Sequence, residues 1–175
     1  MGRYSKMSDS KSLHVVRSAM FAALILVATF IIKIPTPGTG GYIHPGDAFV
    51  ILSGVILGPL YGGAAAAVGS ALADILGGYF IYAPITFLIK GICALGSGFI
   101  FGRFRDKIKK DHLRVILCGV FSTIIVAGGY LVFELFIYGK GAIASVPANL
   151  VQGLSGLVIS SLLYPLLIPR VKKDY

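Results

Sequence analysis

The fold of this chain is decided by residues 83–136, which read APITFLIKGICALGSGFIF (83–101), GRFRDKIKKDHLR (102–114) and VILCGVFSTIIVAGGYLVFELF (115–136). A helix that crosses a membrane needs roughly 20 apolar residues, and each of the two outer segments has about that length. The segment between them holds six Lys and Arg residues. Because basic residues in short loops stay on the cytoplasmic side, the stretch predicts two membrane-crossing helices that meet at the cytoplasmic face.

The same charge pattern recurs at both ends of the chain. Thirteen of the sixteen basic residues fall in three clusters, namely Arg3, Lys6, Lys11, Arg17, then Arg103, Arg105, Lys107, Lys109, Lys110, Arg114, and finally Arg170, Lys172, Lys173. With 56% hydrophobic and 13% charged residues, the chain has too little polar surface for a soluble globule. The positive charge is therefore interpreted as a signal next to the membrane, where it also favours anionic lipid, and binding of nucleic acid is not expected.

Walking along the apolar segments gives an all-α integral membrane protein with six transmembrane helices. Their predicted ranges are 15–32, 47–57, 61–76, 83–101, 115–136 and 146–168. The second is short, so it is tilted, incomplete or continued by the Pro/Gly-rich loop 33–46. An even number of crossings keeps both termini cytoplasmic, as the basic clusters require. We therefore expect a cytoplasmic arm (1–14), a transmembrane substrate-binding domain (15–168) and a cytoplasmic tail (169–175).

Polar side chains gather near the predicted outer ends of these helices and in the adjoining loops. Such groups are costly inside a bilayer unless they face protein or water, so each is a candidate for a binding site. The candidates are Tyr42, His44, Asp47, Asp74, Tyr79, Tyr82, Lys90, Glu134, Asn149 and Gln152. Together they predict a pocket that is open to the outside and suits a small, flat, neutral or weakly charged heterocycle.

Each candidate also has a purely structural interpretation. Asp47 can cap its helix, and Asp74 can form an ion pair with Lys90. Asn149 and Gln152 can join helices by hydrogen bonds. The tyrosines can belong to a belt of aromatic residues at the membrane interface, and Glu134 can be solvated near the surface. The arrival of polar groups from five helices at one level favours a binding pocket.

The sequence offers no catalytic constellation. It contains neither a phosphate-binding Gly-rich loop nor a His-Glu-x-x-His or Ser-His-Asp set, so no catalytic residue, metal or cofactor is predicted. Transport must then be passive, driven by an ion gradient, or powered by a separate ATPase. One alternative is a self-sufficient secondary transporter of a small heterocyclic metabolite, although its two halves show no similarity. Another is an intramembrane enzyme that uses Asp74, Lys90 and Glu134.

Several motifs in the middle of the chain resemble a known family. They are GYIHPGDA (41–48), LGP (57–59), GSALAD (69–74) with Gly78-Tyr79, YAPIT (82–86) and IKG (89–91). The block resembles the S components of energy-coupling factor (ECF) vitamin transporters. Within these it is most similar to the group for hydroxymethylpyrimidine, the thiamine precursor, and for the related uptake of pyridoxine or riboflavin.

The resemblance implies a mechanism and a set of partners. An S component captures its vitamin from outside in a pocket capped by the loop between the first two helices, here 33–46. It then topples in the membrane on a transmembrane T component, driven by two cytoplasmic ATPases that use the ATP. The small face of the first helix, here Ala19 and Ala23, docks on the T component. The chain is thus expected to be a non-enzymatic capture subunit in a bacterial cell membrane, with a hydroxymethylpyrimidine- or pyridoxine-like substrate favoured and riboflavin next.

Overall fold

A computed structural model describes residues 2–36 and 38–171 of the chain. In these residues the main chain forms six α-helices, one two-stranded antiparallel hairpin and one 3-10 helix. In chain order they are α1 (Gly2–Ile31), β1 (Ile34–Pro35), β2 (Tyr42–Ile43), α2 (Asp47–Leu57), α3 (Pro59–Leu76), α4 (Ala83–Arg103), α5 (Asp111–Tyr138), η1 (Gly139–Ser145) and α6 (Val146–Val171). The hairpin pairs Ile34 with Ile43 and Pro35 with Tyr42.

The helices agree with the sequence-based prediction in type and order, and they differ at several ends. The second helix has the predicted bounds, whereas α1 already begins at Gly2 and so runs through the predicted arm. The segment 33–46, predicted as a loop, contains the hairpin, and the connection after the fifth helix is the 3-10 helix η1. Residues 172–175 of the predicted tail lie outside the described residues.

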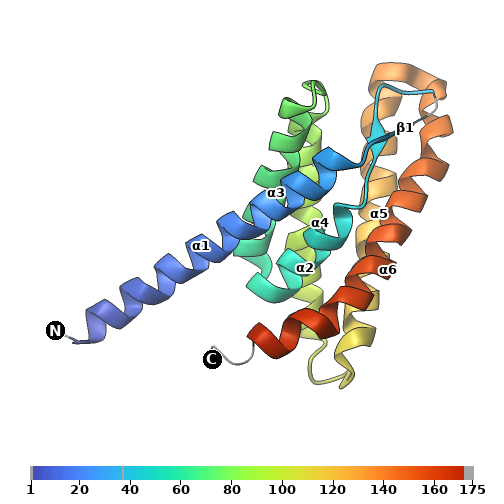
Figure 1. Ribbon diagram of the computed structural model, residues 1–175. Helices are drawn as coiled ribbons and strands as arrows, with labels where there is room; N and C mark the ends of the chain where they lie inside the picture. The colour runs from blue at the N-terminus through green and yellow to red at the C-terminus, as the bar shows by residue number, and fades with distance from the viewer. Residues whose placement is uncertain (1, 37, 172–175) are drawn as a thin grey trace.

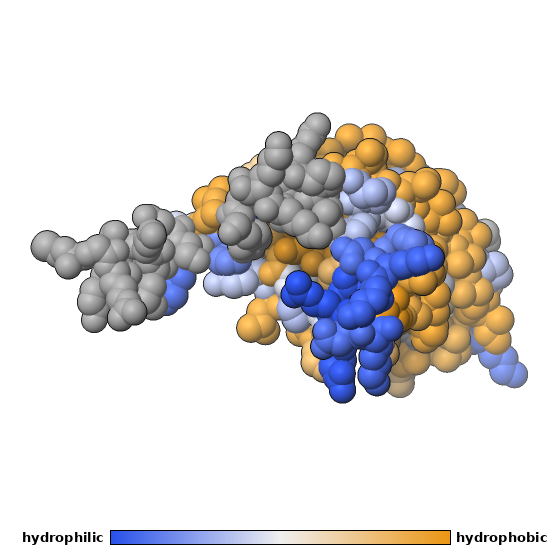
Figure 2. Space-filling view, turned by 90° about the horizontal axis from the view of Figure 1, so that it is seen from below, coloured by the Kyte–Doolittle hydropathy of each residue, from blue (hydrophilic) through white to orange (hydrophobic). Residues whose placement is uncertain are grey.

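The two ends of the bundle differ in character (Figure 1). The start of α1, the α4–α5 connection and the end of α6 lie at one end, which we call the basic end. The hairpin, the α3–α4 connection and η1 lie at the other, which we call the hairpin end. Seen from the basic end, a hydrophilic patch lies next to a largely hydrophobic surface (Figure 2). This grouping agrees with the charge pattern of the sequence, and the cytoplasmic location of both termini stays a prediction.

Not every helix is long enough to cross a bilayer. Among the described residues, four helical segments are long and apolar enough to do so, namely Lys11–Ile31, Pro59–Leu76, Ala83–Arg103 and Asp111–Leu167. The last of these contains α5, η1 and α6. Helix α2 has 11 residues, or about 16 Å at 1.5 Å per residue, against a hydrocarbon core of about 30 Å. Because most of α2 is buried, it is an internal helix, and six full crossings stay a prediction.

Helix α2 reaches the centre of the bundle because glycines let its backbone touch two neighbours. A Cβ atom added at Gly54 would lie 1.9 Å from the carbonyl oxygen of Ala94 in α4. One added at Gly62 in α3 would lie 2.6 Å from the Cα of Gly54, and one at Gly98 in α4 would lie 2.6 Å from the oxygen of Gly54. Small residues allow such close approach and the dispersion contacts that come with it. The packing fixes the position of Asp47, the first residue of α2.

We expect Gly54→Ala to lower the stability of the purified protein, because the new methyl group has no space between α2 and α4. Overpacking of this kind costs about 1–3 kcal/mol. The matched control is Gly128→Ala in α5, where an added Cβ meets no atom within 4 Å. Thermal unfolding in detergent measures the effect, and equal midpoints for the two variants would contradict the close packing of α2.

Candidate functional site

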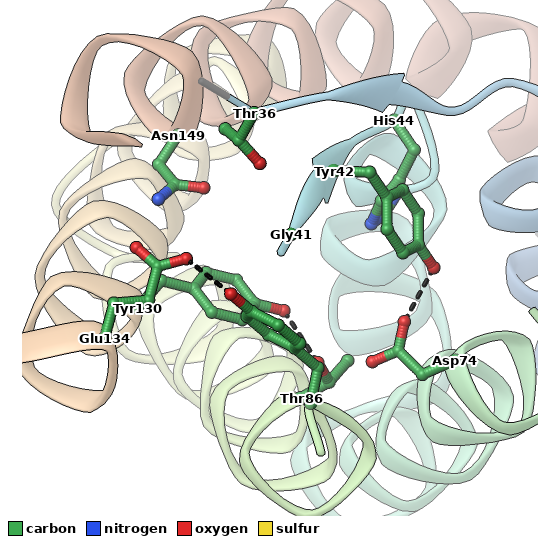
Figure 3. Close-up of a pocket in the computed structure, with 10 residues that line it drawn as sticks. Thr36, Gly41, Tyr42, His44, Asp74, Thr86, Tyr130, Glu134 and Asn149 are labelled. Atoms are coloured by element: carbon green, nitrogen blue, oxygen red, sulfur yellow. Dashed lines mark hydrogen bonds between the residues drawn. The ribbon is translucent and has the colours of Figure 1, made fainter. Parts of the chain in front are cut away.

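A polar cavity lies between the hairpin and α3, α4, α5 and α6 (Figure 3). Its volume is about 20 Å³, which is room for about one water molecule, so a larger ligand requires the cavity to widen. The residues that line it are Thr36, Gly41, Tyr42, His44, Asp74, Tyr82, Thr86, Tyr130, Glu134 and Asn149. Six of the ten predicted site residues therefore face this cavity: Tyr42, His44, Asp74, Tyr82, Glu134 and Asn149.

Asp74 and Glu134 lie on different sides of the cavity (Figure 3), and each accepts a hydrogen bond from a tyrosine. The Tyr42 hydroxyl donates to Asp74 Oδ1 at 2.6 Å, and the Tyr82 hydroxyl donates to Glu134 Oε1 at 3.1 Å. Burial, together with the neighbouring Asp74 carboxylate, raises the pKa of Tyr42, so its hydroxyl keeps the proton that it donates. Carboxylate oxygens of Asp74 and Glu134 are therefore the principal charged groups of the cavity.

Lys90 and Asp47 form an ion pair behind the cavity. Lys90 Nζ lies 2.5 Å from Asp47 Oδ1, and neither side chain is more than 1% exposed. Asp47 Oδ2 accepts a hydrogen bond from the Gln152 amide at 3.0 Å. The interpretation that Lys90 pairs with Asp74 is therefore wrong. The Asp47 carboxylate is occupied by these two side chains, so capping its own helix is not its main role either.

The same network holds the segment that links the hairpin to α2. Gln152 Oε1 accepts a hydrogen bond from the main-chain N–H of His44 at 3.2 Å. Asp47, Lys90 and Gln152 do not line the cavity, although all three were predicted to bind substrate. Their contacts instead connect α2, α4 and α6 to the hairpin segment, which indicates that they position the cavity wall.

His44 lies in this wall as a neutral imidazole. Its Nδ1 accepts a hydrogen bond from the main-chain N–H of Gly46 at 3.1 Å, which places any ring proton on the other nitrogen. The side chain is buried, and this burial lowers its pKa to about 3, with a further lowering by the positive charge of Lys90. The nearby Asp47 carboxylate opposes this effect without cancelling it.

We expect His44 to make stability fall as the pH drops. In the unfolded chain a histidine takes up a proton near pH 6.5, whereas folded His44 does so only near pH 3. Its contribution is therefore fully present above pH 6.5 and is lost below it, by up to about 1.4 kcal/mol per pH unit. Thermal unfolding between pH 7.5 and pH 4.5 should show a flatter profile for His44→Gln, and parallel profiles would contradict the burial of a neutral imidazole.

Tyr79 supports Tyr42 from outside the cavity. The two rings lie 4.4 Å apart between centroids. Lys33 Nζ lies 4.9 Å from the Tyr42 ring, 5.1 Å from the Tyr79 ring and 4.5 Å from the Phe30 ring. A cation over aromatic faces is attracted by their quadrupoles, so this cluster fixes the ring of Tyr42 and with it the hydrogen bond to Asp74.

Four lining residues were not predicted: Thr36, Gly41, Thr86 and Tyr130. The hydroxyl groups of Thr86 and Tyr130 lie 2.9 Å apart. Tyr130 precedes Glu134 by four residues and so shares its helix face, which is a signal that the sequence contains. Thr86 lies in the YAPIT motif. Gly41 carries no polar side chain, so its importance is visible only in three dimensions.

Ala19 and Ala23 are exposed along one side of α1. The neighbouring Ala22 faces α3, where a Cβ added at Gly69 would lie 3.0 Å from the Cα of Ala22. The bundle therefore uses one small face of α1 for its own packing and leaves Ala19 and Ala23 accessible. Their role in docking stays a prediction.

Apolar helices with polar side chains gathered around one cavity are typical of a membrane protein that handles a small molecule. Residues 10–168 match the family described as ECF-type riboflavin transporter, S component. The chain belongs to this family of ECF transporter S components. It is therefore a multi-pass protein of the cell membrane and a transport subunit, so the predicted family and location are confirmed and the intramembrane-enzyme alternative is wrong.

Two proteins and one solved structure are similar to this chain. The chain is 37% identical over 148 residues to an uncharacterized Pyrococcus woesei protein encoded in the gap 3' region, and the match covers 84% of this chain and 96% of that one. It is 30% identical over 169 residues to the thiamine precursor transporter HmpT of Lactococcus lactis subsp. cremoris, covering 93% and 92%. A solved S component of a bacterial ECF transporter has a TM-score of 0.66 at 20% identity, covering 93% and 99%, and so shares the fold.

Proposed function

We propose that this chain is the substrate-capture subunit of an ECF-type importer, which binds a small water-soluble vitamin or precursor from outside the cell. The observation that carries the proposal is the group of polar side chains around one partly open cavity beneath the hairpin, in a chain of the S component family. The partners are a transmembrane T component and two cytoplasmic ATPases. These partners use the ATP, and the chain itself needs no cofactor.

The hairpin segment serves as the lid of the cavity. Four of the lining residues belong to it, namely Thr36, Gly41, Tyr42 and His44. The lid is held by the hydrogen bond between His44 N–H and Gln152 and by that between Tyr42 and Asp74. After capture the subunit topples on the T component, with Ala19 and Ala23 at the contact, and ATP hydrolysis in the partners drives release of the substrate.

A single-ring heterocycle of the hydroxymethylpyrimidine or pyridoxine type is the substrate that fits best. The family description names riboflavin, whereas one relative is named as a thiamine precursor transporter. The cavity has a volume of about 20 Å³, so one ring with short substituents requires less widening than a three-ring flavin with its ribityl chain. The rings of Tyr42, Tyr82 and Tyr130 offer faces for the heterocycle, and the carboxylates offer hydrogen-bond acceptors.

Mass spectrometry of the small molecule that co-purifies with the detergent-solubilised protein tests this function. We expect a pyrimidine or pyridoxine mass, because a capture subunit holds its substrate tightly without its partners. A flavin mass would keep the function and change the substrate. If nothing co-purifies, and vesicles with this chain alone accumulate substrate in an uncoupler-sensitive, ATP-independent way, the protein is a secondary transporter instead.

A further inference from the structure

Lys33 lies at the hairpin end, where basic residues are rare. Thirteen of the sixteen Lys and Arg residues belong to the three basic clusters, and the other three are Lys33, Lys90 and Lys140. Lys90 is neutralised by Asp47, and Lys140 is exposed on η1. In the part of the chain that the structure describes, half-buried Lys33 forms no ion pair with a carboxylate. Its ammonium is therefore stabilised in another way.

Three aromatic rings from three segments of the chain contact the Lys33 ammonium. Phe30 belongs to α1, Tyr42 to the hairpin and Tyr79 to the connection between α3 and α4. The distances from Lys33 Nζ to the three ring centroids are 4.5, 4.9 and 5.1 Å, in that order. The face of an aromatic ring attracts a cation. One ammonium thus joins the end of α1, the hairpin and the α3–α4 connection.

Gly77 leaves the space that this ammonium occupies. It directly follows α3, and its N–H donates to the carbonyl oxygen of Ala73 at 2.9 Å. A Cβ atom added at Gly77 would collide with Lys33 Nζ. A cation at the C-terminal end of a helix is favoured by the helix dipole, so the position beside Gly77 adds to the attraction of the rings. The φ angle of Gly77 is −82°, so its backbone does not require glycine and the space is the feature to explain.

Tyr42 is the member of this cluster that moves with the hairpin. Its hydroxyl donates to Asp74 (Figure 3), and its ring lies 4.4 Å from the Tyr79 ring. Tyr79 is itself held to α3, because its main-chain N–H donates to the carbonyl oxygen of Asp74 at 2.8 Å. Lifting the hairpin therefore separates Tyr42 from a carboxylate, a ring and the Lys33 ammonium together. Loss of the ammonium lowers the cost of every such opening.

We propose that Lys33 is a positioning residue that holds the hairpin closed over the cavity and sets how often the hairpin opens. Lys33 does not line the cavity, so its contacts are the same whether the cavity is empty or filled. A ligand enters and leaves through the same opening. A weaker hold on Tyr42 therefore speeds both steps by the same factor and leaves the affinity unchanged. This inference rests on the proposed capture function and concerns the regulation of its site.

Hydrogen–deuterium exchange of the purified full chain, with no ligand added, tests the opening directly. Two main-chain N–H groups join the hairpin to the helices: His44 donates to Gln152 at 3.2 Å and Gly40 donates to Tyr138 at 3.3 Å. Exchange of such amides follows the fraction of time for which the hairpin is open. Lys33→Met removes the charge, and we expect it to accelerate both exchanges about three- to tenfold, from the loss of a cation–π contact. Amides of α2 and α4 should keep their natural rates.

A second variant and two controls separate the position of the ammonium from its charge. Gly77→Ala keeps the lysine and displaces its ammonium, so it should accelerate the same exchanges by a similar factor. Lys140→Met removes an exposed charge from the same end, and Gly128→Ala adds a methyl group where no atom lies within 4 Å. Both controls should keep natural rates. Natural rates in Lys33→Met and Gly77→Ala, or faster exchange throughout the chain, would overturn the inference.

Rapid-mixing kinetics with hydroxymethylpyrimidine, pyridoxine and riboflavin measure the consequence for binding. For each compound that binds, the association and dissociation rate constants of Lys33→Met should both rise about three- to tenfold, with the same Kd as the natural chain. Faster dissociation alone, with an equal loss of affinity, would overturn the inference, because Lys33 would then act on the bound compound. If none of the three binds and nothing co-purifies, the capture function fails, and the exchange rates still decide whether Lys33 holds the hairpin closed.

Discussion

Replacing Ala19 or Ala23 by tryptophan is expected to abolish uptake of the substrate while leaving its affinity for the purified subunit unchanged. Both alanines are exposed on α1, and a large ring there prevents a partner helix from approaching closely. The cavity is lined by residues of the hairpin, α3, α4, α5 and α6, so binding does not depend on this face. Uptake is measured in cells that co-express the T component and both ATPases, and affinity by calorimetry.

The matched control for this experiment is Ile124→Trp on α5. Ile124 is 64% exposed, so the new ring faces lipid and costs the bundle no packing. This variant should retain both uptake and binding. Weak binding by purified Ala19→Trp would mean that the face of α1 supports the cavity, and normal uptake by both alanine variants would place the docking surface elsewhere.

Lys90→Met is expected to lower the stability of the protein by about 3–5 kcal/mol, the usual cost of removing one partner of a buried ion pair. Lys90 is fully buried, and its ammonium lies 2.5 Å from Asp47 Oδ1. Without it the Asp47 carboxylate keeps only its hydrogen bond from Gln152. Thermal or denaturant unfolding in detergent, without added ligand, measures the loss.

The double variant Lys90→Met/Asp47→Asn separates the charge from the packing. It removes both charges and keeps an amide that can still hydrogen-bond with Gln152, so most of the lost stability should return. An additive loss in the double variant would show that the pair contributes through packing rather than through charge.

Much of the fold can be predicted from the sequence because the residues that begin and end its helices are easy to recognise. The bounds of α2 follow from Asp47 at its start and Gly58-Pro59 after its end, since proline favours the first turn of the next helix. The polar residues near the helix ends could also be predicted to converge, because they lie at similar depths along neighbouring helices. Six of them do line one cavity.

The pairing of Lys90 with Asp47 could not be predicted. Asp47 begins one helix and Asp74 lies near the end of another, both near the level of Lys90. Which of them pairs with Lys90 depends on how each helix is rotated about its axis. Hydropathy does not fix that rotation in a chain whose helices are apolar on nearly every side. The hairpin was missed for a similar reason, because two residues per strand give no periodicity. Gly41 was missed because it has no side chain and lines the cavity with its main chain alone.

The glycine contacts of Gly54, Gly62 and Gly98 also determine which parts of the molecule can move. Where main chains touch directly, no flexible side chain lies between them to absorb a displacement, so α2, α3 and α4 form a stiff block. The hairpin is tied to the helices by few side-chain hydrogen bonds, among them those to Asp74, Gln152 and Tyr138. In the capture function proposed above, entry and exit of a ligand require the hairpin to move against this rigid wall, which breaks those bonds and the ring contact between Tyr42 and Tyr79.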